Sequence, residues 1–144
     1  MRIPKLKIGE LEFKLPIVQG AMGVRVSSHP LPAAVAEAGG LGTITSIGLG
    51  SSDANQETFI GVSREALVEE IRQSRDLDDG GTDKPLALNV MGALSNVHDL
   101  ITTAVSNGIK MIVYGAGIPN KLPKIVPDHS IKLIPMINSA KLAK

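Results

Sequence analysis

Residues 86–114, LALNVMGALSNVHDLITTAVSNGIKMIVY, decide the fold class of this chain. The stretch opens with an apolar run that one asparagine interrupts and closes with a second apolar run, a pattern typical of short strands buried on both faces. Between the runs, Asn96 as N-cap and Gly108 as a stop predict a helix over residues 97–107. Strand, helix and strand in this order predict an α/β fold whose parallel sheet is covered by helices.

The same alternation extends outward on both sides of this stretch. An alternating apolar run over residues 6–15, centred on Gly9-Glu10, predicts an N-terminal hairpin with one buried face. A polar loop is expected over residues 48–61, with Ser63 as N-cap of the helix that follows. Strands are expected at residues 17–18, 41–44, 86–90, 111–114 and 132–135. Helices are expected at 30–38 and 63–75, and one short turn or helix at 119–126.

The end of the sequence interrupts this alternation. Ser139 predicts the N-cap of one more helix, but the sequence stops at Lys144. The strand–helix units are too few for a closed eight-stranded barrel, which takes about 250 residues. We therefore expect residues 1–144 to form a single, incomplete domain. The alternative is an open five-stranded sheet whose last residues fray.

Composition excludes several classes of function. A net charge of +1 argues against nucleic acid as a partner, and so do the few aromatic residues, Phe13, Phe59 and Tyr114. The absence of cysteine removes disulfides and cysteine-based metal sites. The sequence contains neither a long apolar run nor a signal-peptide core, so we expect a cytoplasmic protein without a membrane partner.

The carboxyl ends of the expected strands are the place to look for a site, as in other parallel α/β folds. Small residues there allow a flat ligand to approach the backbone, and amide side chains can hydrogen-bond a heteroaromatic ring. The alternative is that these residues only form tight turns. The ends comprise residues 19–23, 45–46, 89–91, 115–117 and 138–139.

Other motifs in the sequence do not point to chemistry. Gly115-Ala116-Gly117 lacks the third glycine of a dinucleotide fingerprint, and the chain has no phosphate-binding P-loop motif. His29, His98 and His129 lie far apart in sequence and are expected to be surface residues. The pair Glu69-Glu70 is expected on a solvated helix face. No catalytic residue and no metal site is identified.

Five segments, taken in order, carry a family resemblance. They are PIVQGAMG (16–23), AAVAEAGGLG (33–42), LNVM (88–91), YGAGIP (114–119) and IPMINSA (134–140). These segments resemble nitronate monooxygenases, formerly called 2-nitropropane dioxygenases, and the related flavin-dependent enoyl-acyl carrier protein reductases. The similarity extends over nearly the whole chain except the loop near residues 48–61.

The resemblance implies a TIM barrel that binds FMN at its strand ends, of which this chain supplies about the first half. It implies that the flavin is held by the backbone of Gly20, Ala21 and Met22, by Asn89 and by Ser139. The catalytic histidine of the family would lie beyond the last residue. The implied reactions on a small-molecule substrate are oxidation of alkyl nitronates by oxygen, or NAD(P)H-driven reduction of an enoyl thioester.

Three interpretations remain open. The chain is an FMN oxidoreductase, whole or truncated. Or it is a catalytically silent half-barrel that associates with another chain, either a second copy or a different chain that completes the barrel. Or it is a small flavodoxin-like binding domain. Strand order separates the last from the others, because a doubly wound sheet reverses its order whereas a barrel fragment does not.

Overall fold

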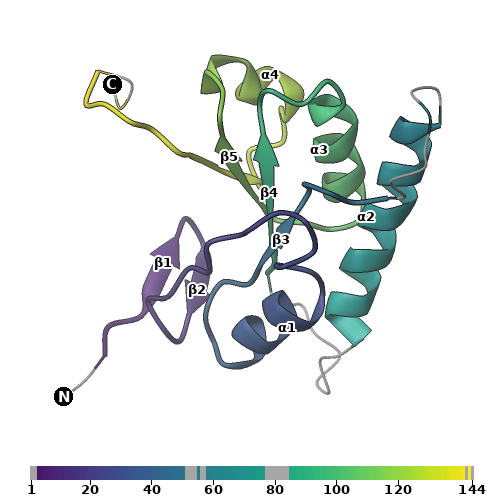
Figure 1. Ribbon diagram of the computed structural model, residues 1–144. Coiled ribbons are helices and arrows are strands. Elements are labelled where there is room, and N and C mark those ends of the chain that lie inside the picture. Colours follow the sequence, from purple (N-terminus) through teal and green to yellow (C-terminus); the bar gives the residue numbers. More distant parts are fainter. Residues whose placement is uncertain (1–2, 51–54, 56–57, 77–84, 142, 144) are drawn as a thin grey trace.

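The computed structural model describes residues 3–50, 55, 58–76, 85–141 and 143. A parallel sheet forms its centre (Figure 1). Neighbouring strands in this sheet are also neighbours in sequence, so the order does not reverse. The flavodoxin-like interpretation is therefore wrong, since a doubly wound sheet has a switch point. The strands, in spatial order, are β3 (Thr43–Thr45), β4 (Ala87–Met91), β5 (Met111–Gly115) and β6 (Lys132–Pro135).

The first expected strand is reduced to one bridge. Val18 pairs in parallel with Leu41, flanked by hydrogen bonds from Leu41 N to Ile17 O (2.9 Å) and from Gln19 N to Leu41 O (3.0 Å). Leu41 was expected inside the second strand, but β3 begins only at Thr43. The bridge lies beside β3, so the chain order continues from residue 18 across to β6.

The helix α2 (Phe59–Asp76) begins earlier than predicted. Asn55 starts it: its Oδ1 accepts the Thr58 N–H at 2.9 Å, and its backbone oxygen accepts the Phe59 N–H at 2.9 Å. Ser63 is therefore not a cap. It lies within the helix, 2% exposed, with Oγ 3.5 Å from Leu49 O. The expected loop over 48–61 thus ends in helix, and its residues 51–54 and 56–57 lie outside the described residues.

The other helices agree better with the sequence. The helix α1 (Pro30–Glu37) and the helix α3 (Val97–Ser106) form where expected, although Asn96 makes no side-chain capping bond. The segment expected at 119–126 is a short η1 (Pro119–Lys121) followed by α4 (Leu122–Ile125).

The last expected helix is not formed in the part of the chain that the structure describes. Ser139 lies in a bend, and residues 140, 141 and 143 lie in a turn closed by a bond from Ala143 N to Ala140 O (3.3 Å). The N-cap prediction for Ser139 is therefore wrong. An isolated helical turn gains too few hydrogen bonds to offset the entropy of ordering it.

Both faces of the two central strands, β4 and β5, carry buried side chains. Leu88, Val90 and Ile112 pack in one core with residues of α2 and α3. Ala87 and Met111 lie on the opposite face, because side chains alternate along a strand. They pack there against a second core that contains Phe13, which is 4% exposed.

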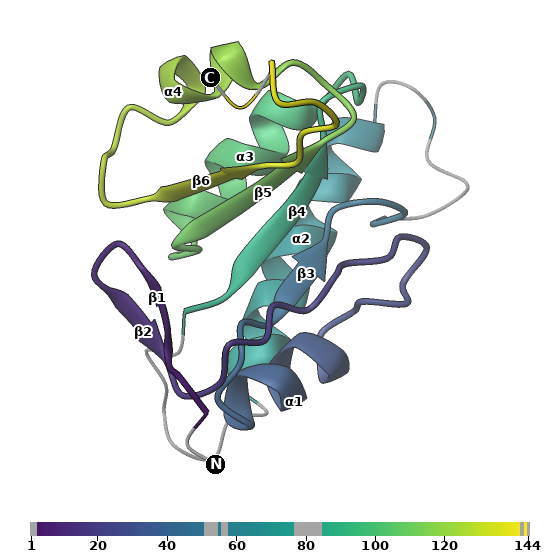
Figure 2. The same cartoon turned by 90° about the vertical axis from the view of Figure 1, so that its left-hand side faces the viewer.

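The second core belongs to the predicted N-terminal hairpin. It pairs β1 (Leu6–Ile8) with β2 (Leu11–Phe13) in antiparallel register. Figure 2 looks onto the sheet face opposite the helices and shows the hairpin at one end of it. The hairpin contacts the first residues of β4 and β5, so it covers the amino ends of the strands. Further along this face Asn89 and Met91 are only partly buried, toward the carboxyl ends where the sequence places the site.

Candidate functional site

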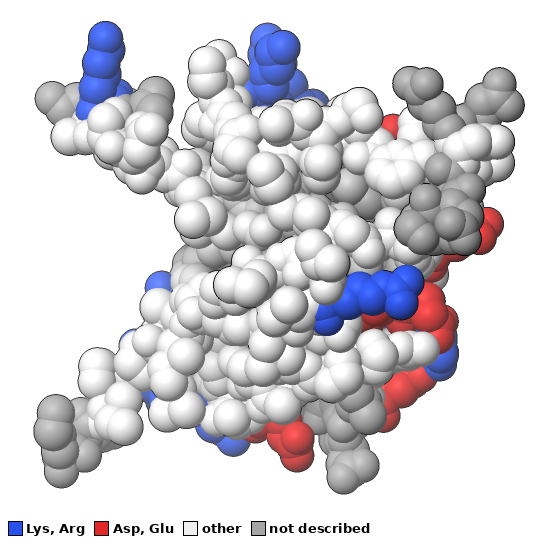
Figure 3. Space-filling model, viewed as in Figure 1, with Lys and Arg blue, Asp and Glu red and all other residues white. Residues whose placement is uncertain are grey.

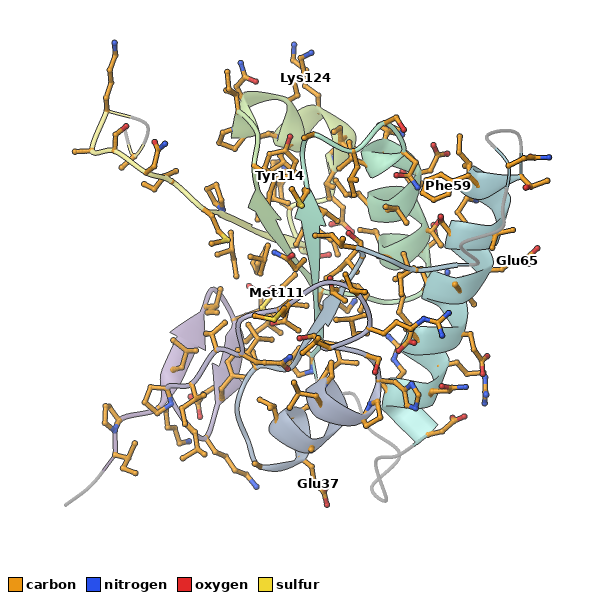
Figure 4. All side chains as sticks on the ribbon, in the orientation of Figure 1. Glu37, Phe59, Glu65, Met111, Tyr114 and Lys124 are labelled. Atoms are coloured by element: carbon orange, nitrogen blue, oxygen red, sulfur yellow. The ribbon has the colours of Figure 1, made fainter. Side chains whose placement is uncertain are left out.

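The carboxyl ends of the strands lie opposite the hairpin. Figure 4 shows the contrast along β5, with Met111 near the hairpin and Tyr114 near the other end of the sheet. Hydrogen bonds join the loops that leave this edge. Ser46 N donates to Asn89 O at 3.0 Å, and Gly92 N donates to Gly115 O at 2.8 Å. The strand ends are therefore held in register at the candidate site.

Gly20, Ala21 and Met22 follow the bridge at Val18 and enter the loop toward α1. Gly20 is exposed, and a Cβ built on it would meet nothing within 4 Å. Among the described residues, the amides of Gly20 and Ala21 have no hydrogen-bond partner. The Met22 amide differs, because it donates to Ser27 Oγ at 3.0 Å. Two of these three backbone amides are thus open to a ligand.

Gln19 has a structural role that its sequence position does not reveal. Its Nε2 donates to Thr43 O at 3.2 Å, and its Oε1 accepts the Thr43 N–H at 3.1 Å. The side-chain amide therefore continues the parallel pairing beyond the bridge at Val18. One N–H and the carbonyl oxygen of the Gln19 amide are therefore used within the sheet.

Asn89 lies on the sheet face away from the helices, two residues beyond Ala87. It is partly buried, and its Nδ2 lies 3.5 Å from Val113 O, a long contact. The amide therefore keeps hydrogen-bonding capacity for a ligand at this face.

Tyr114 packs behind the neighbouring loops. A Cβ on Gly92 would lie 2.1 Å from its hydroxyl oxygen, and a Cβ on Gly117 would lie 2.7 Å from it. These glycines are thus needed for space, which supports the tight-turn interpretation at these two positions.

The structure does not gather every candidate residue. Ser139 is exposed, and Figure 1 shows the segment after β6 running away from the sheet. Met22 and Met136 are each 64% exposed on loops that leave the carboxyl edge. Among the described residues, Ser139 has no hydrogen-bond partner that would hold it at the strand ends.

The surface exposure predicted for the three histidines is confirmed for two of them and wrong for the third. His98 and His129 are exposed, as expected. His29 is not a free surface residue: its backbone N–H donates to Glu70 Oε2 at 2.6 Å, and its Nδ1 lies 3.2 Å from the same oxygen. The side chains of His29 and Glu70 are 30% and 17% exposed, so the expectation of a solvated Glu70 is also wrong. Sequence reasoning missed this pair because its members are far apart in sequence and meet only through packing of α1 against α2.

Three residues other than glycine, among those that the structure describes, have left-handed backbone angles, all near strand carboxyl ends. They are Val24 (φ 53°), Arg25 (φ 63°) and Ala116 (φ 49°). Such angles are uncommon outside glycine, and for a β-branched valine they are a strained exception. Strain of this kind concentrates at functional sites and is held there by surrounding contacts.

The strongest electrostatic interactions lie away from this edge. Hydrogen bonds from Arg72 and Gln73 lower the pKa of Glu69 on α2 to about 2. Figure 3 shows acidic side chains gathered over α2, whereas the centre of the face in view carries few charges. An open groove of about 710 Å³ lies between α2 and α3, lined by residues such as Arg64, Asp99 and Thr102, and not at the strand ends. Among the described residues, no three acidic or histidine side chains are grouped to hold a metal ion.

Comparison with known proteins defines the class and then the family. The chain superposes on FabK from Thermotoga maritima with a TM-score of 0.67 and 30% sequence identity over 89% of its own length. It also superposes on an IMP dehydrogenase/GMP reductase-like protein from Corynebacterium glutamicum, with a TM-score of 0.65 and 19% identity over 96% of its length. The fold is thus a set of parallel β/α units that matches part of a TIM barrel, preceded by a hairpin.

The family follows from the sequence. The family model for nitronate monooxygenase matches residues 5–142, and the chain belongs to that family. A search of curated proteins finds no match. The chain spans 35% of the length of the FabK chain and 44% of the Corynebacterium chain. No helix in the described part of the chain is long and apolar enough to cross a membrane.

Proposed function

We propose that this chain contributes the flavin-ring side of an FMN-dependent oxidoreductase that oxidises alkyl nitronates with oxygen. The observation that carries the proposal is the pair of amides at Gly20 and Ala21 that have no partner in the described part of the chain, inside a family match that covers residues 5–142. Unpaired backbone donors at a strand carboxyl end are suited to the carbonyl and nitrogen acceptors of a flat heteroaromatic ring.

The residues of this edge fit such a ring. Gly20 leaves open space, so a ring can approach the backbone closely. In the proposal, the amides of Gly20 and Ala21 donate to the ring and Asn89 adds a side-chain amide from β4. Bound FMN would supply the redox chemistry. The protein groups would orient the ring and, through the neighbouring apolar side chains, limit water around it.

A second reaction remains as an alternative within the same family. The chain would then take part in NAD(P)H-dependent reduction of an enoyl thioester. The described residues include no identified proton donor that distinguishes the two reactions, so the distinction rests on assay. In both cases the substrate is a small molecule.

Flavin titration tests the proposal. Added FMN should change its absorbance and lose fluorescence on binding to the purified chain. Asn89→Ala should weaken binding by about two- to tenfold, the loss of one hydrogen bond. Asn107→Ala is the matched control, because Asn107 bonds Thr103 O at the end of α3, away from the site. A chain that binds no FMN at millimolar concentration would contradict the proposal.

Activity assays then separate the two reactions. If the proposed reaction is right, a flavin-loaded sample should consume oxygen on addition of propyl-2-nitronate. The alternative predicts NAD(P)H oxidation with a crotonyl thioester instead. Loss of either activity in a flavin-free sample would tie it to the cofactor.

We also propose that the open edges of the sheet associate with further barrel strands, from a second copy or from another chain. Exposed apolar side chains near the open edges support this: Ile17 is 54% and Val18 49% exposed beside β3, and Ile137 is 42% exposed after β6. An edge strand offers unpaired backbone groups to a partner.

A further inference from the structure

We propose that Ser27 is the positioning residue that sets the backbone of Gly20, Ala21 and Met22 for the cofactor. This inference rests on the proposed FMN function. In this proposal the serine contacts neither the ring nor a reacting atom, and it acts through Met22. Its role is to occupy one backbone donor of the loop and so decide which donors remain for the ligand.

Two reciprocal hydrogen bonds close the loop between Met22 and Ser27. Met22 N donates to Ser27 Oγ at 3.0 Å, and Ser27 N donates back to Met22 O at 3.1 Å. Ser27 is 1% exposed, so water does not compete for its hydroxyl. A buried hydroxyl with a defined partner holds its geometry more firmly than an exposed one.

The residues enclosed by these bonds are strained. Val24 and Arg25 both have left-handed backbone angles, with φ of 53° and 63°. The Val24 side chain does not explain this conformation, since it is 79% exposed. The conformation persists because contacts around the loop determine it, and the Met22–Ser27 pair closes the loop at its base.

The closed loop is also attached to the end of β3. Val24 N donates to Ile47 O at 3.1 Å, and Thr45 N donates to Ser27 O at 3.2 Å. Ser27 therefore links the Met22 amide to a strand end. Through this link the loop after the bridge at Val18 has a fixed place relative to the sheet.

Ser27 determines which of the three consecutive amides of residues 20–22 remain available to a ligand. With Ser27 in place, the Met22 N–H is occupied and points into the loop, while those of Gly20 and Ala21 remain available. Removing the hydroxyl would free the Met22 amide and release the loop conformation. The two available donors would then no longer be presented in one geometry to a flat ring.

The experiment compares Ser27→Ala with Ser27→Thr, which keeps a hydroxyl, and with Ser27→Cys, which keeps the volume but accepts hydrogen bonds weakly. Ser28→Ala is the matched control, because the Ser28 hydroxyl has no hydrogen-bond partner among the described residues. Two readouts are used on the full chain: hydrogen exchange of the Met22 amide without flavin, and the Kd for FMN from fluorescence quenching. Far-UV circular dichroism verifies that each variant folds.

We expect Met22 exchange to accelerate at least tenfold in Ser27→Ala and the Kd for FMN to rise about two- to tenfold. Ser27→Thr should keep both the Met22 exchange rate and the Kd for FMN close to those of the unchanged chain. If the extra methyl group of threonine prevents folding, Ser27→Cys should give values between those of the unchanged chain and those of Ser27→Ala. Ser28→Ala should match the unchanged chain.

Unchanged Met22 exchange in Ser27→Ala would overturn the inference, and so would faster exchange with an unchanged Kd. Failure of the unchanged chain to bind FMN would instead overturn the proposed function. Faster exchange in Ser27→Ala would in that case still support the control of the Met22 amide by Ser27.

Discussion

Lys132 Nζ lies 2.8 Å from Glu10 Oε2 and joins the first residue of β6 to the tip of the N-terminal hairpin. The same ammonium donates to His129 O at 3.2 Å. The hydrogen bond from Lys132 is the main cause that lowers the pKa of Glu10. The Lys132 stem lies directly over Gly9, where a Cβ would come within 2.7 Å of the lysine Cε. The hairpin therefore closes the amino end of the sheet through a contact that needs glycine at its turn.

Gly9→Ala should destabilise the chain. Gly9 has a φ of +60°, and alanine in this conformation costs roughly 1–2 kcal/mol, in addition to the displacement of Lys132. Urea unfolding measures the loss. Gly61→Ala is the control: Gly61 lies inside α2, its added Cβ meets nothing, and alanine should stabilise the helix by roughly 0.5–1 kcal/mol. Equal stability of the two variants would contradict the need for glycine at the hairpin turn.

Gln19→Ala should cost about 1–3 kcal/mol of unfolding free energy, because it leaves the N–H and C=O of Thr43 without partners. Thr43 is 1% exposed, so water cannot readily replace the lost amide. Gln73→Ala, on the exposed surface of α2, should change stability little. Gln19→Glu should also lose stability, since it removes the donor. A Gln19→Ala variant as stable as Gln73→Ala would show that the side chain does not extend the sheet.

We expect the chain to lose stability in acid as Glu69 becomes protonated. Its pKa, lowered from 4.5 to about 2 mainly by the hydrogen bond from Arg72, means that folding favours its ionised form. Its contribution is therefore complete above about pH 4.5 and is lost as the pH falls toward 2. The free energy of unfolding, measured from pH 6 to pH 2, should depend less on pH in Glu69→Gln than in the unchanged chain.

Glu65→Gln is the control on the same helix, because Glu65 has no ion-pair or hydrogen-bond partner among the described residues. Its pH dependence should follow that of the unchanged chain. The difference between Glu69→Gln and the unchanged chain should shrink in high salt, since the pair with Arg72 is exposed. Identical curves for both variants would contradict the prediction.

Leu133→Pro should weaken association through the edge of β6. Lys132 N and Met136 N both donate inward to the β5 side, so residues 133 and 135 direct their N–H groups outward. Position 135 is already proline, and a second proline would remove another outward donor. Light scattering after size exclusion should show dimers or larger species for the unchanged chain and fewer for the variant.

Leu133→Ala is the matched control for Leu133→Pro, because it removes the same side chain and retains the N–H. It should associate like the unchanged chain. A monodisperse monomer of the unchanged chain that unfolds cooperatively would contradict the proposed association.

The sequence predicted most elements of the sheet because its strands are short apolar runs bounded by turn residues. The bounds of β6 agree with the prediction, and those of β4 and β5 differ by one residue. Helix starts were less predictable. Ser63 resembles an N-cap by type and spacing, but Asn55 and Thr58 begin α2 earlier, and a capping bond depends on geometry that residue type does not specify.

The candidate site, too, was only partly predictable from the sequence. Gly20, Ala21, Met22 and Asn89 were predicted from the family resemblance, and their final roles as ligand-binding residues stay predictions. The structure added what spacing could not indicate: Gln19 is bonded to the backbone of β3, and the Met22 amide is bonded to Ser27.

Local sequence by itself determined the alternation of strands and helices, the hairpin and the parallel class of the sheet, since apolar periodicity and turn residues act over a few positions. Only the tertiary structure decided the strand order, the pairing of His29 with Glu70 and the choice of amides left open at the strand ends. These depend on contacts between segments far apart in sequence. Such contacts form only when the sheet and its helices pack, because burial then selects which polar groups must find partners within the chain.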